Sequence, residues 1–243
     1  MRIDDRQPDE LRSLSFRRRY TRQTPGSVLV RMGRTTVLCT CSVDEHVPSF
    51  LLGTGKGWLT AEYNMLPGST SPRKPRDRAG KVDGRSVEIQ RLIGRSLRAV
   101  IDLGKLGERT LWLDCDVLEA DGGTRTASIN GAYVALIDAL AATKLLKTQP
   151  AGLIRDSVAA ISVGLVNGVA LLDLAYEEDR DAEVDLNLVM TGSGQFIEVQ
   201  GTGEEATFSR AQLDELLKLG KVGIDAITAE QRQALGSYWP LDK

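Results

Sequence analysis

Two short stretches of the sequence combine residue types that can do chemistry together. The first is Asp121-Gly122-Gly123-Thr124-Arg125, in which paired glycines precede a hydroxyl and a guanidinium. Backbone N–H groups at such a turn can converge on one anion, the start of a following helix adds favourable potential, and Arg125 offers a planar fork for phosphate oxygens. A capped helix start with a tight turn uses the same residue types, but the combination favours a site for a small anion.

The second stretch is acidic and contains Asp179 and Asp185, six positions apart across a predicted turn. Two carboxylates that converge there could hold one divalent cation, or one of them could serve as an acid. The neighbouring acids crowd the stretch with like charge, which disfavours full ionisation unless a cation is near. They are Glu177, Glu178, Asp181 and Glu183. A solvated acidic loop explains the same residues, and from composition alone it is the simpler interpretation.

Several familiar kinds of catalytic site are excluded by what the 243 residues lack. The single histidine, His46, rules out a zinc site that needs two, and no nucleophile-elbow motif accompanies it. The glycine-rich segment 53–57 has neither the spacing nor the Ser or Thr of a nucleotide-triphosphate loop. Cys39, Cys41 and Cys115 lack CxxC spacing, which indicates buried free thiols in a reducing compartment.

The net charge of −2 conceals two opposed blocks. Residues 73–98 carry nine basic and three acidic side chains, a charge of +6, whereas residues 173–185 carry seven acidic and one basic, a charge of −6. A long basic loop over Pro67–Gly84, beside an arginine-lined helix, suits a polyanion because each neutralised phosphate releases counterions. A solvated helix face and loop account for the same charges, so charge alone leaves nucleic-acid binding open.

The elements that must position these residues follow from the hydrophobic pattern. Strands are predicted over 27–32, 35–43, 58–66, 110–118, 182–190 and 195–199, and helices over 86–103, 128–146, 209–219 and 228–235. The uncharged run Ser157–Leu172 is too short for a membrane span and contains Asn167-Gly168, which predicts two buried strands joined by a hairpin turn. The order of elements predicts a single α+β domain over residues 1–243, and the charged first ten residues predict no targeting segment.

Together these residues predict an enzyme with a small-phosphate pocket, a track for a polyanion and a pair of carboxylates, but without a histidine base. Orthophosphate as the attacking nucleophile fits this set, because phosphate brings its own negative oxygen and needs positioning more than deprotonation. The interpretation fixes a class of chemistry and leaves the substrate open.

Longer motifs, in a fixed order, extend over nearly the whole chain. The helix motif reads Gly84-Arg85-Ser86-Val87-Glu88-Ile89-Gln90-Arg91, and the strand motif Leu113-Asp114-Cys115-Asp116-Val117-Leu118 runs into Ala120–Ile129. Further motifs are Gly57–Tyr63, Tyr176–Asp179, Ala182–Asp185 and Glu198–Glu204. In their order along the chain, the motifs resemble those of the bacterial ribonuclease PH family.

The resemblance implies a ribosomal-protein-S5-domain-2-like α+β fold, a layered α/β sandwich. It implies a phosphate-dependent 3′→5′ exoribonuclease that trims the 3′ ends of tRNA precursors and other RNAs. Such an enzyme releases nucleoside 5′-diphosphates and runs in reverse as a nucleotidyltransferase. The resemblance also implies inorganic phosphate as co-substrate, Mg²⁺ as cofactor, a cytoplasmic location away from membranes, and a homohexamer built as a trimer of dimers.

By motif, the resemblance puts the phosphate site on Arg85, Gly123, Thr124 and Arg125. It assigns Asp179 and Asp185 to metal binding and to protonation of the leaving group. The basic loop and the following helix supply the expected RNA contacts, which are Arg73, Lys74, Arg76, Arg78 and Arg91.

Three positions depart from the family pattern. Gly68 stands where relatives commonly carry an arginine that contacts RNA, Asp5 replaces the usual glycine before Arg6, and Ser13 replaces the usual proline. The phosphate and carboxylate motifs are complete, so activity is expected. Two alternatives are a catalytically silent RNA-binding ring subunit and a metal-dependent hydrolase that uses the acidic residues with water. The complete motifs argue against a silent subunit. A requirement for phosphate would distinguish the phosphorolytic exoribonuclease from a hydrolase.

Overall fold

Two β-sheets form the frame of the protein, in a computed structural model that describes residues 2, 4–76, 83–148, 151–204 and 206–241. The five-stranded sheet has the order β1-β2-β3-β5-β4, with β4 and β5 parallel and the other neighbours antiparallel. Its strands are β1 (Leu14–Arg18), β2 (Gly26–Met32), β3 (Thr35–Asp44), β4 (Trp58–Met65) and β5 (Thr110–Glu119). The four-stranded sheet is antiparallel, with the order β7-β6-β8-β9. Its strands are β6 (Val158–Val166), β7 (Val169–Leu172), β8 (Val184–Thr191) and β9 (Phe196–Gly203).

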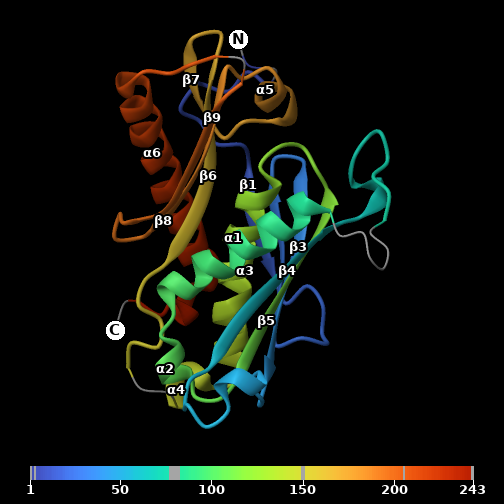
Figure 1. Cartoon of the computed structure of the whole chain (residues 1–243), viewed down its shortest axis with the longest axis vertical. Coiled ribbons are helices and arrows are strands. Elements are labelled where there is room, and N and C mark those ends of the chain that lie inside the picture. Colours follow the sequence, from blue (N-terminus) through green and yellow to red (C-terminus); the bar gives the residue numbers. More distant parts are fainter. Residues whose placement is uncertain (1, 3, 77–82, 149–150, 205, 242–243) are drawn as a thin grey trace.

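The helices lie between and beside the sheets (Figure 1). They are α1 (Gly84–Val100), α2 (Leu103–Leu106), α3 (Thr124–Ala142), α4 (Leu145–Thr148), α5 (Tyr176–Arg180) and α6 (Arg210–Leu235). Central α3 contacts β2 and β3 of one sheet and β6 of the other, so both of its sides are covered. Its nearly uninterrupted apolar sequence fits that position, because a helix with no polar face must be buried. Helix α1 packs on β4, and α6 packs along β6 and β7.

One connected apolar core joins the two sheets. Buried side chains from β2, α1, β5, α3, β6 and α6 all belong to it, for example Val28, Leu92, Leu113, Leu136, Ile161 and Ile224. Burial of this much apolar surface is the main stabilising contribution to the fold. The mixture of two sheets and packed helices is the α+β arrangement that the sequence predicted.

Helix boundaries differ from the predicted ones at three places. Helix α3 begins at Thr124 instead of residue 128, because the left-handed Gly123 (φ 64°) turns the chain directly into the helix. The predicted helix over 86–103 ends at Val100, since Ile101 leaves it to form a bridge with Ile154. The predicted helix over 128–146 also divides, into α3 and the short α4.

The carboxy-terminal helix was wrongly predicted as two stretches. The structure has one 26-residue helix, α6, and Thr228 lies inside it instead of at a cap. The predicted capping box at Ser209 is present. Gly220 and Gly223 weaken the helical pattern in the sequence, but they allow close packing. A Cβ at Gly220 would lie 2.7 Å from Leu188, and a Cβ at Gly223 would lie 2.8 Å from Leu172. Strand β1 was not predicted at all, because it is only five residues long and two of them are arginines, which leaves a weak apolar pattern.

Two other sequence predictions, the hairpin turn and the buried thiols, are confirmed. Asn167 and Gly168 both have positive φ and join β6 to β7 as a hairpin turn. Cys39, Cys41 and Cys115 are buried free thiols. Among the described residues, no helix combines the length and the hydropathy that crossing a membrane requires.

Candidate active site

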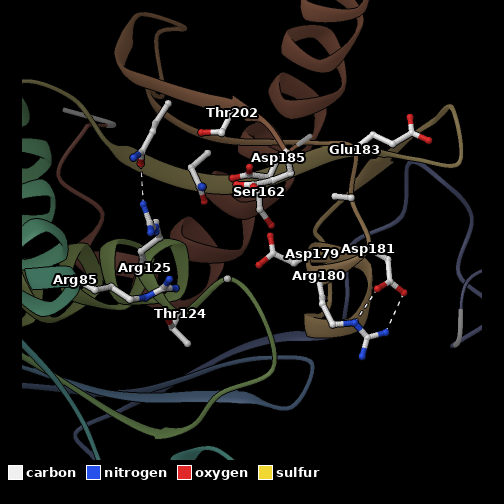
Figure 2. Close-up of a pocket in the computed structure, with 15 residues that line it drawn as sticks. Arg85, Thr124, Arg125, Ser162, Asp179, Arg180, Asp181, Glu183, Asp185 and Thr202 are labelled. Carbon is white, nitrogen blue, oxygen red and sulfur yellow. Dashed lines mark hydrogen bonds and ion pairs between the residues drawn. The ribbon is translucent and has the colours of Figure 1, made fainter. Parts of the chain in front are cut away.

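All six predicted phosphate and carboxylate residues line one pocket of about 670 Å³. Arg85 comes from the first turn of α1, and Gly123, Thr124 and Arg125 from the start of α3. Asp179 lies on α5 and Asp185 near the start of β8. Figure 2 shows the two arginines and Thr124 on one side of the pocket, opposite the two aspartates. The fold therefore brings the predicted anion site and the predicted acidic site together.

The anion side is a turn followed directly by a helix, and we call residues 121–125 the phosphate turn. Gly122 and Gly123 both adopt left-handed conformations (φ 74° and 64°), which lets the chain reverse just before Thr124. Thr124 Oγ1 accepts a hydrogen bond of 2.9 Å from the buried Tyr63 hydroxyl. Because that oxygen is already accepting, its own proton is free to donate to a ligand in the pocket.

Arg125 is held by two neighbours through one nitrogen. Its Nη1 donates to Gln200 Oε1 at 2.7 Å and lies 3.3 Å from Glu88 Oε1. Among the described residues its other guanidinium nitrogens have no hydrogen-bond partner, so they can bind an anion as a planar fork. The guanidinium of Arg85 lies across the pocket from the aspartates, on an exposed side chain.

The acidic side consists of Asp179 and Asp185, the carboxylate pair. Burial raises the pKa of Asp185, and the negative charges of Asp179 and Glu204 raise it further. The pKa of Asp179 is also raised by desolvation, although its side chain is exposed to the pocket and Arg85, Arg125 and Arg12 oppose the shift. Two carboxyls with raised pKa values at one place gain from a cation, or can hold a proton.

Adjacent residues of the acidic segment 177–185 point to different places. Glu178, next to Asp179, turns away from the pocket and is 7% exposed. It pairs with Arg2 at 2.7 Å and with Arg6 at 3.4 Å. Burial alone would raise its pKa, but the hydrogen bonds from Arg2 and the Ala175 N–H, with the charges of both arginines, hold the pKa below its usual value. Glu178 thus belongs to an ion cluster behind α5, whose members are Arg2, Arg6, Arg12, Asp173 and Glu178.

The carboxylate pair fits a magnesium ion that is completed by substrate. Among the described residues no three His, Cys, Asp or Glu side chains are placed to hold a metal by themselves. Magnesium, however, is usually bound by one or two carboxylates together with substrate phosphates and water. Asp179 and Asp185 supply that minimal set, and their pKa values are raised even though nearby arginines oppose the shift.

None of the predicted RNA contacts that the structure describes lines the pocket. Arg73 and Arg76 are exposed in the segment after β4, and Arg91 is exposed on α1. Lys74 Nζ pairs with Asp83 at 2.6 Å, which ties this segment to the start of α1. Arg78 lies outside the described residues. A side chain at the exposed Gly68 would meet open space, since nothing lies within 4 Å of a Cβ built there.

Several pocket residues were missed in the sequence. Asn187, Gln200, Thr202 and Glu204 line the pocket beside Asp185, and Ser162 lines it from β6. The strand registers explain this, because Asp185 pairs with Thr202 and Asn187 pairs with both Gln200 and Ser162. Their signal was the alternation of polar residues at positions 185 and 187 and at 200, 202 and 204, which places them on one sheet face.

Known proteins resemble the chain over nearly its whole length. A family model described as "3' exoribonuclease family, domain 1" matches residues 10–141, and "3' exoribonuclease family, domain 2" matches residues 156–223. A protein of Rhodopirellula baltica named ribonuclease PH is 59% identical over 93% of this chain and 94% of its own length. A Bacillus velezensis protein of the same name is 55% identical over 99% of both. The crystal structure of rice (Oryza sativa) Rrp46 has the same fold, with a TM-score of 0.79 and 20% identity over 96% of this chain and 99% of its own.

Proposed function

The chain belongs to the ribonuclease PH family of 3′ exoribonucleases, and on that premise we propose that the pocket between the phosphate turn and the carboxylate pair is its active site. Family membership makes the chain a phosphorolytic 3′→5′ exoribonuclease, a nucleotidyltransferase that processes tRNA. The observation that carries the proposal is that one pocket unites an anion-binding helix start with two carboxyls whose pKa values are raised.

Inorganic phosphate is the nucleophile in this proposal. It lies at the first turn of α3, where Thr124 and the free nitrogens of Arg125 donate hydrogen bonds and Arg85 faces it from α1. A phosphate oxygen attacks the phosphorus of the last phosphodiester of the RNA. The bond between that phosphorus and the 3′ oxygen of the preceding nucleotide breaks, and a nucleoside 5′-diphosphate leaves. Holding both groups in line supplies most of the rate gain, because phosphoryl transfer depends on positioning and charge stabilisation.

The carboxylate pair serves the leaving group and the metal. The departing 3′ oxygen needs a proton, and a carboxyl with a raised pKa, such as Asp185, can hold and deliver one. Mg²⁺ bound by Asp179 and Asp185 would offset the negative charge that phosphate and RNA bring into the pocket. Gln200 and Glu88 fix Arg125, so the guanidinium is oriented before phosphate arrives.

The RNA track is proposed on the basic residues outside the pocket, namely Arg73, Lys74, Arg76, Arg78 and Arg91. Replacing the four residues of the loop together should weaken the binding of tRNA precursors and reduce the slope of log affinity against log salt by about 0.7 to 0.9 per lost phosphate contact. A short single-stranded RNA should still be degraded, because the pocket is unchanged. Equal loss on both substrates in parallel kinetics at two salt concentrations would contradict this role for the loop.

Assembly and location are also proposed from the family resemblance. We expect a homohexamer, a trimer of dimers, located in the cytoplasm, and light scattering of the purified chain tests the hexamer.

A single folding unit over residues 1–243 is supported by the apolar core that joins the two sheets. One cooperative transition, coincident by fluorescence and by circular dichroism, is the expected result.

Phosphate dependence is the decisive test of the function. RNA is incubated with the purified protein and Mg²⁺, with and without inorganic phosphate, and the products are separated by chromatography. Phosphorolysis gives nucleoside diphosphates, and it gives them only when inorganic phosphate is present. Nucleoside monophosphates without phosphate would establish a hydrolase, and no product under either condition would indicate a silent subunit, which the relatives at 59% and 55% identity do not favour.

A further inference from the structure

A single buried arginine joins the two sides of the pocket from behind. Arg12, just before β1, has a side chain that is only 3% exposed. Its Nη2 and Nε donate to the Asp173 carboxylate at 2.7 and 3.0 Å, and its backbone N–H donates to the same carboxylate at 2.9 Å. Its Nη1 donates in the opposite direction, to the backbone carbonyl oxygen of Asp121. Arg12 thus contacts two loops that are 52 positions apart in the sequence.

Each of these loops leads directly into a set of pocket residues. Asp121 opens the phosphate turn, which ends at Arg125 in α3. Asp173 opens the segment that enters α5 and carries Asp179. The aspartate is completely buried and has a left-handed backbone (φ 54°), a conformation that costs a non-glycine residue free energy unless its surroundings hold it. Three hydrogen bonds from Arg12 hold its carboxylate, while hydrogen bonds with Arg2, Arg6 and Ser162 hold its backbone.

The two loops also touch each other, with no room between them. A Cβ at Gly122 would lie 2.6 Å from Leu174 O and 2.9 Å from Tyr176 N, and a Cβ at Gly123 would lie 3.1 Å from Arg12 Nη2. The amino-terminal segment runs beside α5 and β7 (Figure 1), and Pro8 O accepts a hydrogen bond from Leu172 N at 2.8 Å. The phosphate turn and the segment that enters α5 are therefore packed directly against each other, and Arg12 is hydrogen-bonded to both.

The bonding of Arg12 suits this task. Burial alone would lower the pKa of Arg12, but Asp173, with smaller contributions from Asp121 and Glu178, more than compensates, so the group stays charged. A guanidinium can bind a carboxylate with two donors and still direct a third elsewhere, whereas a lysine ammonium acts from one point. Only arginine at this position spans both loops with defined angles.

Resting on the proposed function of this pocket, we propose that Arg12 is a positioning residue for phosphorolysis: it fixes the distance between the phosphate turn and the carboxylate pair through Asp121 and Asp173. Arg12 is not among the residues that line the pocket, so in this proposal it acts through the two loops. Because a misplacement of about 1 Å can cost about 100-fold in rate, a residue that sets this distance affects turnover without contacting a reacting atom.

The test uses Arg12→Lys in the full-length enzyme, with steady-state phosphorolysis measured at varied inorganic phosphate. We expect the KM for phosphate to rise about tenfold and kcat to fall about tenfold or more, because the lysine keeps the charge but cannot span both loops. Asp173→Asn is the second variant, since it keeps the shape and weakens the same link, and it carries the test if Arg12→Lys does not fold. The same direction of change is expected from it.

Arg2→Lys is the matched control. Arg2 is equally buried and pairs with Glu178 and with Asp173 O, but none of its hydrogen bonds to described residues reaches the phosphate turn. It should lower the melting temperature and leave both kinetic constants of the folded enzyme within about twofold, as expected of a group outside the reacting geometry. Unchanged constants in folded Arg12→Lys, or an equal change in Arg2→Lys, would overturn the positioning role. A wild-type enzyme that needs no phosphate would instead overturn the proposed function itself.

Discussion

The ion cluster behind α5 and the pocket in front of it are built from the same residue types, arginines and carboxylates, with opposite results. In the cluster Glu178 is buried and paired, and its pKa is lowered. In the pocket the adjacent Asp179 is exposed and no described residue forms an ion pair with it, and its pKa is raised. In each case the direction of the pKa shift depends on whether the carboxylate has an ion-pair partner, and not on how exposed it is. The cluster uses its charges to hold the backbone, while the pocket leaves its charges available for a substrate.

The largest effect on turnover is expected from a substitution of Asp185 in the pocket. Asp185→Asn keeps the shape of the side chain but removes both its charge and its ability to donate a proton as a carboxyl. Phosphorolysis and the reverse synthesis should both fall by about 10² to 10⁴-fold, because microscopic reversibility couples the two directions. Rates in each direction, measured on folded protein, check this.

Glu177→Gln is the control for that comparison, since Glu177 belongs to the same acidic run but is exposed outside this pocket. It should leave both rates within about twofold, as a surface change distant from special features usually does. If Asp185→Asn lost only one direction, its assigned role in the pocket would be wrong.

In the ion cluster, a substitution should lower the stability of the protein and leave turnover unchanged. Glu178→Gln removes the carboxylate that pairs with the buried Arg2, although Arg6 keeps its ion pair with Asp4, and the free energy of unfolding should fall by about 3 to 5 kcal/mol at neutral pH. Because the folded pKa of Glu178 is lowered, its contribution is complete above its unfolded pKa and is lost as the pH falls through the folded value. The difference between variant and wild type should therefore shrink below about pH 4.5.

Urea unfolding at several pH values measures that difference, again with Glu177→Gln beside it. A difference that stays constant down to pH 3 would mean that Glu178 stabilises the protein by packing and not by charge. Loss of turnover in folded Glu178→Gln, with stability unchanged, would remove the distinction between cluster and pocket.

The difference between these regions also marks how far the sequence predicts the site. Arg85, the last three residues of the phosphate turn and the carboxylate pair belong to local motifs, and all of these line one pocket, although their roles stay predictions. Nothing local separates Glu178 from Asp179, because the partner that decides the matter, Arg2, is 176 positions away. Arg12 and Asp173 went unnoticed for the same reason. Sequence periodicity indicates which face of an element is buried, but not which charges meet across the fold.

A smaller effect is expected at the support of the phosphate turn. Tyr63→Phe removes the hydroxyl that donates to Thr124 Oγ1 while keeping the buried ring. Losing one such hydrogen bond costs about 1 kcal/mol, so the KM for phosphate should rise about fivefold with a smaller change in kcat. Tyr133→Phe is the control, because the buried Tyr133 hydroxyl has no hydrogen-bond partner among the described residues. An equal rise in both variants would show that Thr124 does not depend on Tyr63.

The smallest effect is expected on the amino-terminal segment, where the cluster holds a strained residue. Asp5 lies between Arg2 and Arg6 and has a left-handed backbone (φ 58°), at the position where the family usually has glycine. Asp5→Gly relieves that conformation but costs entropy in the unfolded chain, so a net gain of about 0.5 kcal/mol in unfolding free energy is expected. Asp4→Gly is the matched control and should destabilise, because Asp4 pairs with Arg6 at 2.6 Å and its φ is not positive. Turnover should stay unchanged in Asp5→Gly, since the cluster's side chains keep their partners. If Asp5→Gly changed the KM for phosphate instead, strain in this segment would reach the pocket, and cluster and pocket would have to be treated as one unit.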